Sequence, residues 1–300
     1  MPRSVVAALL LLVLVAVRPS PVAAGKDGFD DFVAVVGGRA AAGTRWLAGC
    51  NLLITPAGEV RRPCNLALVD LVTDPTGVTL EVTRNEVADL HHSQYQARDA
   101  TVEARAGGKV VATFRVVEIS GLGNPDSPTG GWDPIAVHWM QLVTDKQARA
   151  RAKAGTLRTP PALADAVVVP TGDDQNASDS ERLVDDLERA LRTEPALRDR
   201  LAEWLADGVI VFGSAPGQKL TGKKGARTVR GWKLDLVQRG GTVRWADDML
   251  GVAVTDIVGT TRGKAPASLT YRSMVVFTQG LTDAGSLISG PRLVTFALPR

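Results

Sequence analysis

Long apolar runs, cysteines, histidines and aromatic side chains are all scarce in this sequence of 300 residues. Its one long apolar run, Val5–Val17, is interrupted by Arg18 and is too short for a spanning helix, which needs about 20 residues. A small-residue stretch ending at Ala24 follows, as at the cleavage site of an exported protein. We therefore expect a signal peptide over residues 1–24 and a secreted mature chain, periplasmic or extracellular, that begins near Gly25 without a membrane span.

A marked excess of positive charge is also absent once the leader is set aside. The whole chain has 35 Lys and Arg against 32 Asp and Glu, and two of the arginines, Arg3 and Arg18, lie in the expected leader, which has no acidic residue. The mature chain is therefore close to neutral. Because nucleic-acid-binding domains usually carry a clear basic excess, the composition argues against a nucleic-acid partner.

Motifs for catalysis and for cofactor binding are missing as well. The sequence has no Gly-x-Ser-x-Gly elbow, no phosphate-binding Gly-x-x-x-x-Gly-Lys-Ser/Thr loop, and no Cys-x-x-Cys or His-Glu-x-x-His spacing. We therefore expect no cofactor, and whether the protein is an enzyme stays open.

The two cysteines, Cys50 and Cys64, flank a predicted hairpin. A Pro-Ala-Gly stretch centred on Ala57 has the residue types of a three-residue hairpin loop. A hairpin folded there pairs Thr55 with Glu59 and brings the cysteines opposite each other. In an oxidising compartment this arrangement predicts a disulfide that staples the hairpin, rather than a redox-active pair.

Alternation of apolar and polar residues predicts strands over most of the chain. Residues 78–83 and 101–106 alternate with period two, and Gly107-Gly108 has the composition of a two-residue turn into Lys109–Ile119. Strand patterns return near the C-terminus, over Val209–Phe212, Val229–Gln238, Thr242–Trp245 after a Gly240-Gly241 turn, Gly251–Val258, Leu269–Thr278 and Leu293–Leu298. Many short strands with Gly-rich turns predict a mainly β fold, sandwich- or barrel-like, of antiparallel hairpins.

A pair of helices is predicted between the β-rich parts, which makes the fold α+β overall. Ser178 and Glu181 form a capping box ahead of leucines spaced by four over Leu183–Leu191. Pro195 can begin a second helix that ends near Gly208. We expect β-rich parts at residues 25–144 and 209–300, as one domain or two, around a helical insertion at 145–208.

The weak catalytic candidates lie near a Gly- and Pro-rich stretch that is predicted to be a loop over residues 120–134. Only three histidines exist, and the adjacent His91 and His92 would point to opposite sides of a strand. A secreted hydrolase would have to combine His91 or His138 with a nearby carboxylate such as Asp133.

The same stretch suggests two kinds of binding site. Asn124, Asp126 and Asp133 are oxygen donors of the kind that calcium prefers, although the spacing of a dedicated calcium loop is missing. Trp132 and Trp139 would suit the face of a sugar if they were exposed, but tryptophan in a β protein is more often part of the core.

The strongest patch of one charge sign is the stretch Lys219–Lys233, which contains no acidic residue. Its basic residues are Lys219, Lys223, Lys224, Arg227, Arg230 and Lys233. Glycines in its first half predict a flexible loop. Such a loop is either a solvated connection or a site for sulfated polysaccharide, cell-wall phosphate or lipid headgroups.

Together these features predict a soluble exported protein of the cell envelope or exterior that acts by binding, with an unknown ligand. Two alternatives remain open. One is a secreted hydrolase built around His91 or His138, and the other is a surface protein that binds polyanions through Lys219–Lys233. A polysaccharide or an envelope surface is the partner that these residues would suit.

Overall fold

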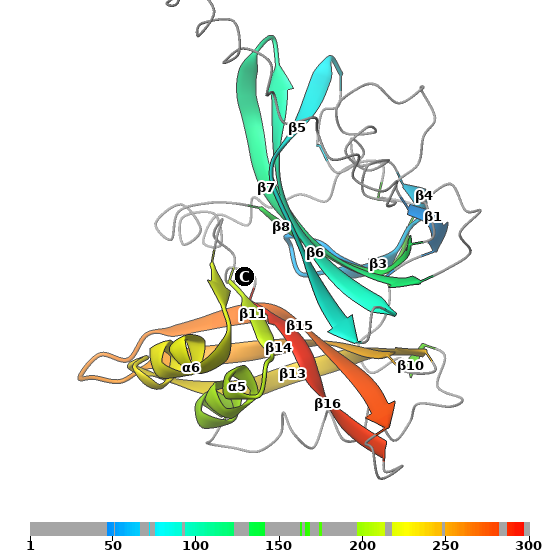
Figure 1. Ribbon diagram of the computed structural model, residues 1–300. Helices are drawn as coiled ribbons and strands as arrows, with labels where there is room; N and C mark the ends of the chain where they lie inside the picture. Colours follow the sequence, from blue (N-terminus) through cyan, green and yellow to red (C-terminus); the bar gives the residue numbers. More distant parts are fainter. Residues whose placement is uncertain are drawn as a thin grey trace, which may run out of the picture.

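The protein is a β sandwich of two mixed, seven-stranded sheets, with helices over the outer face of the second sheet (Figure 1). The computed structural model describes residues 47–50, 52–66, 72, 76–91, 94–122, 132–141, 163, 166–168, 174–175, 197–213, 218–247, 250–281 and 287–296. The predicted mainly β fold is confirmed, and of its two forms the sandwich is the one observed.

The first sheet has the strand order β5-β6-β7-β8-β2-β3-β9. Its strands are β2 (Leu52–Ile54), β3 (Val60–Arg62), β5 (Val78–His91), β6 (Tyr95–Ala106), β7 (Lys109–Leu122), β8 (Trp132–Gln141) and β9 (Val167–Val168). Strands β5 to β8 form an antiparallel meander, whereas β8 runs parallel to β2, with Ala136 opposite Leu52. Strands β1 (Leu47–Cys50) and β4 (Cys64–Leu66) pair separately.

The second sheet has the order β10-β13-β14-β15-β16-β11-β12. Its strands are β10 (Asp174–Gln175), β11 (Ile210–Phe212), β12 (Lys219–Leu220), β13 (Leu234–Asp247), β14 (Leu250–Thr261), β15 (Ser268–Leu281) and β16 (Leu287–Thr295), and its helices are α5 (Leu197–Ala206) and α6 (Gly222–Arg230). Strands β13 to β16 form an antiparallel meander, and β16 runs parallel to β11, with Leu293 opposite Ile210.

The two sheets repeat one topology. In each, a short hairpin is followed by a four-stranded meander whose last strand lies parallel to the first strand of the hairpin. The meander strands have 14, 12, 14 and 10 residues in the first sheet and 14, 12, 14 and 9 in the second. We use the name first unit for β2, β3 and β5 to β8, and second unit for β11 to β16 with helices α5 and α6.

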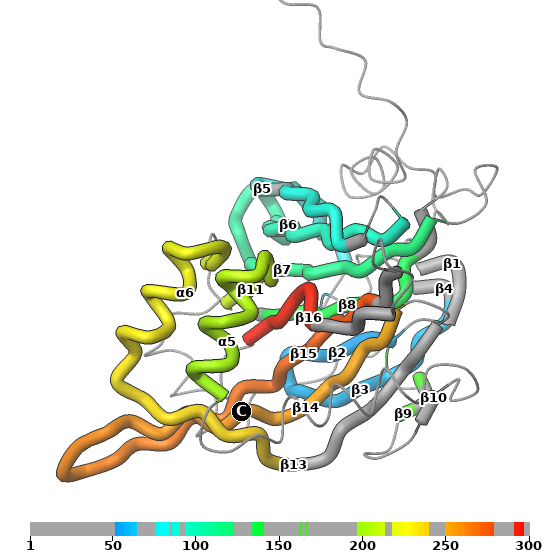
Figure 2. The backbone as a smooth tube through the Cα atoms, turned by 60° about the horizontal axis from the view of Figure 1, so that its bottom comes forward, coloured from blue at the N-terminus to red at the C-terminus, as the bar shows by residue number. Residues whose placement is uncertain are grey.

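The inner faces of the two sheets form a shared core. Apolar residues of the first unit, such as Val117 and Ile119, pack in one cluster with Val252, Val254 and Met274 of the second. Figure 2 shows the two layers stacked on each other, and a hairpin between β14 and β15 that projects beyond them. Face-to-face packing of alternating strands is the arrangement expected of a sandwich.

Helices α5 and α6 cover the outer face of the second sheet. The predicted second helix is confirmed as α5, whose Leu197, Leu201 and Leu205 are buried together with Phe277 and Val294 of the sheet. Leucines spaced by four lie on one side of a helix, so this side meets the sheet while the other faces solvent.

The predicted register of the cysteine hairpin is confirmed. The backbone N–H of Thr55 donates to the carbonyl of Glu59 at 2.9 Å, and Cys50 lies opposite Cys64. Gly58 has a φ of +78°, the conformation that its place in the loop requires. The predicted two-residue turn at Gly107-Gly108 is also confirmed, since both glycines have positive φ and strands β6 and β7 pair directly beside them.

Four local predictions were wrong. The stretch from residue 219 is not a flexible loop, because most of it forms β12 and α6, and the strand expected from Val229 begins at Leu234. Strand β13 runs through Gly240-Gly241 with a shift of register where a turn was expected. Both ends of the predicted 120–134 loop are strands, since β7 extends to Leu122 and β8 begins at Trp132.

The remaining predicted elements lie outside the described residues. They are the helix over Leu183–Leu191 and residues 123–131 of the predicted loop. Among the helices that the structure describes, none combines the length and apolar character that crossing a membrane requires.

Candidate anion-binding surface

Helix α6 is held to the second unit by its small and apolar face. Gly225, Ala226 and Val229 are buried, and a Cβ placed on Gly225 would lie 3.2 Å from atoms of Leu205 and of Leu220. Glycine therefore lets the helix approach its neighbours closely. Ala, Lys and Arg are also good helix formers. Propensity and packing together therefore favour a helix over the flexible loop that the glycines had suggested.

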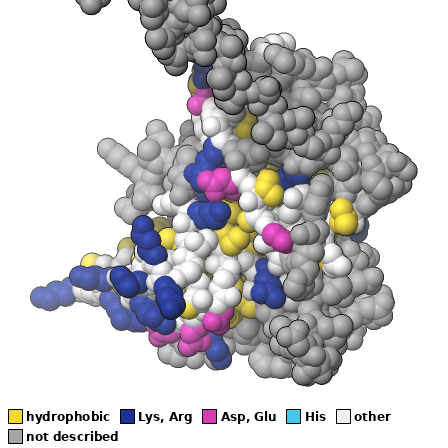
Figure 3. Space-filling model, viewed as in Figure 1, with side chains coloured by type: hydrophobic (Ala, Val, Ile, Leu, Met, Phe, Trp, Pro, Cys, Tyr) yellow, Lys and Arg dark blue, Asp and Glu magenta, His cyan; other side chains and the backbone are white. Residues whose placement is uncertain are grey.

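The opposite face of α6 presents cations to solvent. Lys223, Lys224, Arg227 and Arg230 are all exposed, and none of them has an ion-pair partner within the described part of the chain. Figure 3 shows Lys and Arg gathered over this part of the molecule. The two lysines lie in the first turn, where the helix dipole disfavours positive charge, so they oppose rather than support the helix.

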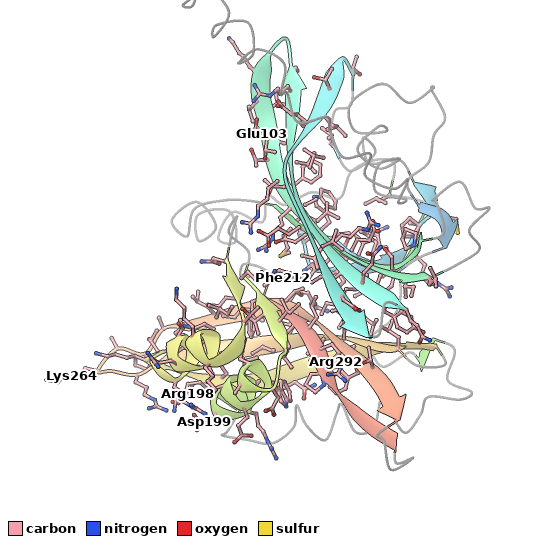
Figure 4. The ribbon with its side chains drawn as sticks, in the orientation of Figure 1. Glu103, Arg198, Asp199, Phe212, Lys264 and Arg292 are labelled. Atoms are coloured by element: carbon pink, nitrogen blue, oxygen red, sulfur yellow. The ribbon has the colours of Figure 1, made fainter. Side chains whose placement is uncertain are left out.

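Two further lysines, one after α6 and one on the projecting hairpin, add to this charge. Lys233, just beyond the C-terminus of α6, and Lys264, at the hairpin tip, are exposed and also lack an ion-pair partner among the residues described. In Figure 4, Lys264 points away from the body of the protein. We use the name basic surface for Lys223, Lys224, Arg227, Arg230, Lys233 and Lys264.

The acidic residues beside the basic surface are matched by arginines. Arg262 forms an ion pair with Asp235, and this bond lowers the pKa of the Asp235 carboxyl. Arg198 lies 3.3 Å from Asp199, and Figure 4 shows this pair below the helices. Neither carboxylate therefore neutralises the basic surface.

Lys219 belongs to a different environment from the rest of its sequence stretch. Its Nζ lies 3.3 Å from a carboxylate oxygen of Glu86, on strand β5 of the first unit. The hydrogen bond from Arg84 and then that from Lys219 lower the pKa of Glu86. Lys219 therefore links the two units instead of extending the basic surface.

A second group of charges lies buried between the sheets. Arg115 of β7 is fully buried and forms a two-bond ion pair with Asp99 of β6, with both N–O distances at 2.5 Å. Arg115 also donates to the carbonyl of Gly213 in the second unit, and its guanidinium lies 5.1 Å from the ring centroid of Phe212. A single arginine thus ties the two units together. We use the name buried seam for the buried polar residues Asp99, Arg115, His138, Arg272 and Thr295.

His138 lies in the buried seam and not in a cleft. Its ring is fully buried, and Nδ1 lies 2.6 Å from Oγ1 of Thr295 on β16. Burial, and then the positive charges of Arg272 and Arg115, lower the pKa of His138 from 6.5 to about 3. Thr295 Oγ1 also accepts from the backbone N–H of Met274 at 2.9 Å and lies 3.4 Å from the Met274 carbonyl, so this hydroxyl joins His138 to strand β15.

The arrangement around His138 gives the hydrolase hypothesis no support. Its partner is a hydroxyl and not a carboxylate, and Nε2 has no hydrogen-bond partner among the described residues. An imidazole with no exposed surface cannot contact a substrate unless the sheets separate. For His91 and Asp133 the structure describes only the backbone, opposite Tyr95 and Gly121.

The other predicted binding residues do not come together. Trp139 is buried and makes an edge contact with Phe114, with ring centroids 6.3 Å apart, so it is a core residue and offers no sugar-binding face. Only the backbone of Trp132 is described, and Asn124 and Asp126 lie outside the described residues. Within the described ranges, no group of three or more potential metal-ligating side chains forms.

No protein-family model matches this sequence, and no curated protein matches it either. The chemistry of the basic surface is therefore the best guide to function.

Proposed function

We propose that this protein is an exported binding protein that holds polyanions on its basic surface. The observation that supports this proposal most strongly is the exposed face of α6. It carries Lys223, Lys224, Arg227 and Arg230 in nine residues with no acidic residue in the helix. Multivalent sulfates or phosphates are the ligands that such a face would attract.

Two features of these charges oppose the helix, although Arg227 and Arg230 lie in its last turn, where the dipole favours cations. Lys223 and Arg227 are four residues apart, and Arg227 and Arg230 are three apart, so each pair of like charges repels across one helical turn. The first-turn lysines also oppose the helix dipole. A bound polyanion would relieve both effects.

The fold itself does not require a basic segment at this point. In the first unit, the corresponding stretch lies between the hairpin and strand β5, at residues 67–77. It contains Asp70 and Asp74 and no Lys or Arg. The positive charge is thus particular to the second unit, which favours a role in binding over a role in maintaining the topology.

The composition of the basic surface suits sulfate and phosphate groups. Arginine can donate two parallel hydrogen bonds to such a group, whereas lysine acts as a point charge. All of the described large apolar side chains that are exposed, namely Val87, Val110, Val111, Leu122 and Val168, lie on other elements. Contacts through charge are therefore what this surface offers.

Export is part of the proposal, and the cysteine hairpin supports it. Cys50 lies opposite Cys64, where a disulfide can form once thiols oxidise. The intact mass of the secreted protein tests both points. We expect the mass of a chain without residues 1–24. We also expect alkylation to increase this mass only after the protein has been reduced. A full-length chain with two free thiols would contradict both expectations.

Retention on a heparin column tests the binding function. We expect the protein to be retained at low salt and released as sodium chloride is added, because each neutralised anion releases counterions. An uncharged agarose column is the control. Failure to bind heparin at low salt, or retention that salt does not weaken, would argue against the proposal.

A further inference from the structure

We infer that the ligand is a linear polyanion long enough to lie along both α6 and the β14–β15 hairpin, and not a small anion or a lipid surface. This inference rests on the proposed function and adds the length and shape of the ligand. Its basis is that the basic surface has two arms. One arm is α6, from Lys223 to Arg230, and the other runs from Lys233 to Lys264 at the hairpin tip (Figures 3 and 4).

Backbone and side-chain bonds hold the hairpin arm at the end of α6. The backbone N–H of Arg262 donates to the carbonyl of Lys233 at 3.2 Å, and the Arg262 side chain pairs with Asp235. Thr261 closes the hairpin, since its N–H donates to the carbonyl of Ala267 at 2.9 Å and its hydroxyl accepts from Ala267 N–H at 2.8 Å. The two arms are thus already joined before a ligand binds.

The dimensions of the arms favour a chain over a single anionic group. Seven residues of helix separate Lys223 from Arg230, which is about 10 Å along its axis. Lys264 lies beyond Arg262 in the bend at the hairpin tip, so it adds to the reach of the second arm. A ligand with one or two anionic groups can reach only one arm, whereas a polymer gains contacts with every added repeat until both arms are occupied.

A lipid bilayer fits this surface less well. The apolar side of α6, with Ala226 and Val229, is buried against the second unit and cannot enter a membrane. The hairpin tip, Arg262–Ala267, carries no large apolar side chain. A helix or loop that inserts at a membrane surface presents an apolar face beside its cations, and this surface has none.

Oligosaccharides of different length test the inference on the full chain. We expect a sulfated heparin octasaccharide to bind more tightly than the disaccharide. Lys264→Ala should weaken octasaccharide binding about threefold and leave disaccharide binding unchanged, since the value of one exposed charge pair is small. Lys223→Ala should weaken both. Lys109→Ala, at another exposed hairpin after a glycine turn, is the matched control and should change neither.

Several results would overturn the inference while leaving the proposed function intact. One is an equal effect of Lys264→Ala on both oligosaccharides, and another is equal affinity for the two lengths. A third is binding to vesicles of equal parts phosphatidylglycerol and phosphatidylcholine as tight as binding to the octasaccharide at the same anionic-group concentration. Absence of salt-sensitive binding to any of these ligands would instead reject the proposed function itself.

Discussion

Positively charged side chains have one role in the buried seam and the opposite role on the basic surface. In the buried seam, Arg115 is matched by Asp99 and has no exposed surface. On the basic surface, cations such as Arg227 are exposed and have no ion-pair partner in the described part of the chain. The comparison shows that the seam's charges serve the fold, while the surface charges are available to a ligand. Four predictions test this division.

Removal of Arg115 should have the largest effect on stability. Arg115→Met would leave the Asp99 carboxylate buried without its partner, and breaking a buried pair in this way costs about 3–5 kcal/mol. Urea denaturation should show this loss in the free energy of unfolding. A double variant with Asp99→Leu should recover most of it, because an apolar pair avoids the unmatched charge. If the double variant is no more stable than the single one, the ion pair is not the cause.

Acid should destabilise the protein through His138. The pKa of this group is about 3 in the fold and 6.5 in its absence, so the unfolded chain binds a proton first as the pH falls. The stability that the neutral ring contributes is therefore complete above pH 6.5 and decreases toward pH 3. By pH 4 the loss is on the order of 3 kcal/mol.

The variant His138→Leu isolates this effect from the titration of carboxyl groups. Leucine is chosen because the second unit has a leucine at the corresponding place. Val117 lies opposite His138 in the first unit, and Val276 lies opposite Leu293 in the second. Unfolding at pH 7 and pH 4 should show a smaller acid loss in the variant. Equal losses in the two proteins would mean that His138 does not titrate on unfolding as described.

Charge reversal on α6 should remove binding while the fold is kept. We expect Lys223→Glu with Lys224→Glu to lower the affinity for heparin at least tenfold, since two attractions become repulsions. Both lysines lie in the first turn, where glutamate suits the helix dipole, so stability should not fall. Heparin-column elution and a thermal melt measure the two quantities. Lys109→Glu is the control, and equal losses in both variants would point to net charge alone.

The smallest effects are expected at Lys219. Because the pair with Glu86 is partly exposed, Lys219→Ala should change the free energy of unfolding by no more than about 1 kcal/mol. Heparin elution should not change, although Lys219 belongs to the same basic stretch of sequence as Lys223. A loss of binding comparable to that of Lys223→Ala would show that the basic surface extends across to the first unit.

Features set by neighbouring residues could be predicted from the sequence. The hairpin between Cys50 and Cys64 depends on a loop whose proline and glycine define its centre, so its register followed directly. Helix α5 followed from leucines at regular spacing. In both cases the pattern and the packing favour the same structure.

Features that depend on distant contacts could not be predicted in this way. The stretch around α6 is rich in glycine, and its burial against Leu205 and Leu220 favours the helix that the glycines alone did not predict. Lys264 joins the basic surface from another element, and no local pattern relates it to Lys223. The positive charge of Lys219–Lys233 was visible in the sequence. The pairing of Lys219 with Glu86, which separates it from the exposed cations, was not.

The repeated topology was also hidden in the sequence. Strands β7 and β15 share only a short similarity, in which Val116-Val117 and Gly121-Leu122 match Val275-Val276 and Gly280-Leu281. A sandwich tolerates many apolar exchanges as long as the alternation of its faces is kept. The strand order therefore shows the repeat much more clearly than the residues do.

The parallel pairings of β2 with β8 and of β11 with β16 bear on the order of folding. Each joins strands roughly 80 residues apart, so each closes a long loop, at an entropic cost that its meander must first offset. The first unit has all its strands from β2 to β8 by residue 141, less than halfway along the chain. A chain that emerges from its N-terminus can thus complete the first unit early and offer its apolar inner face as a template for the second.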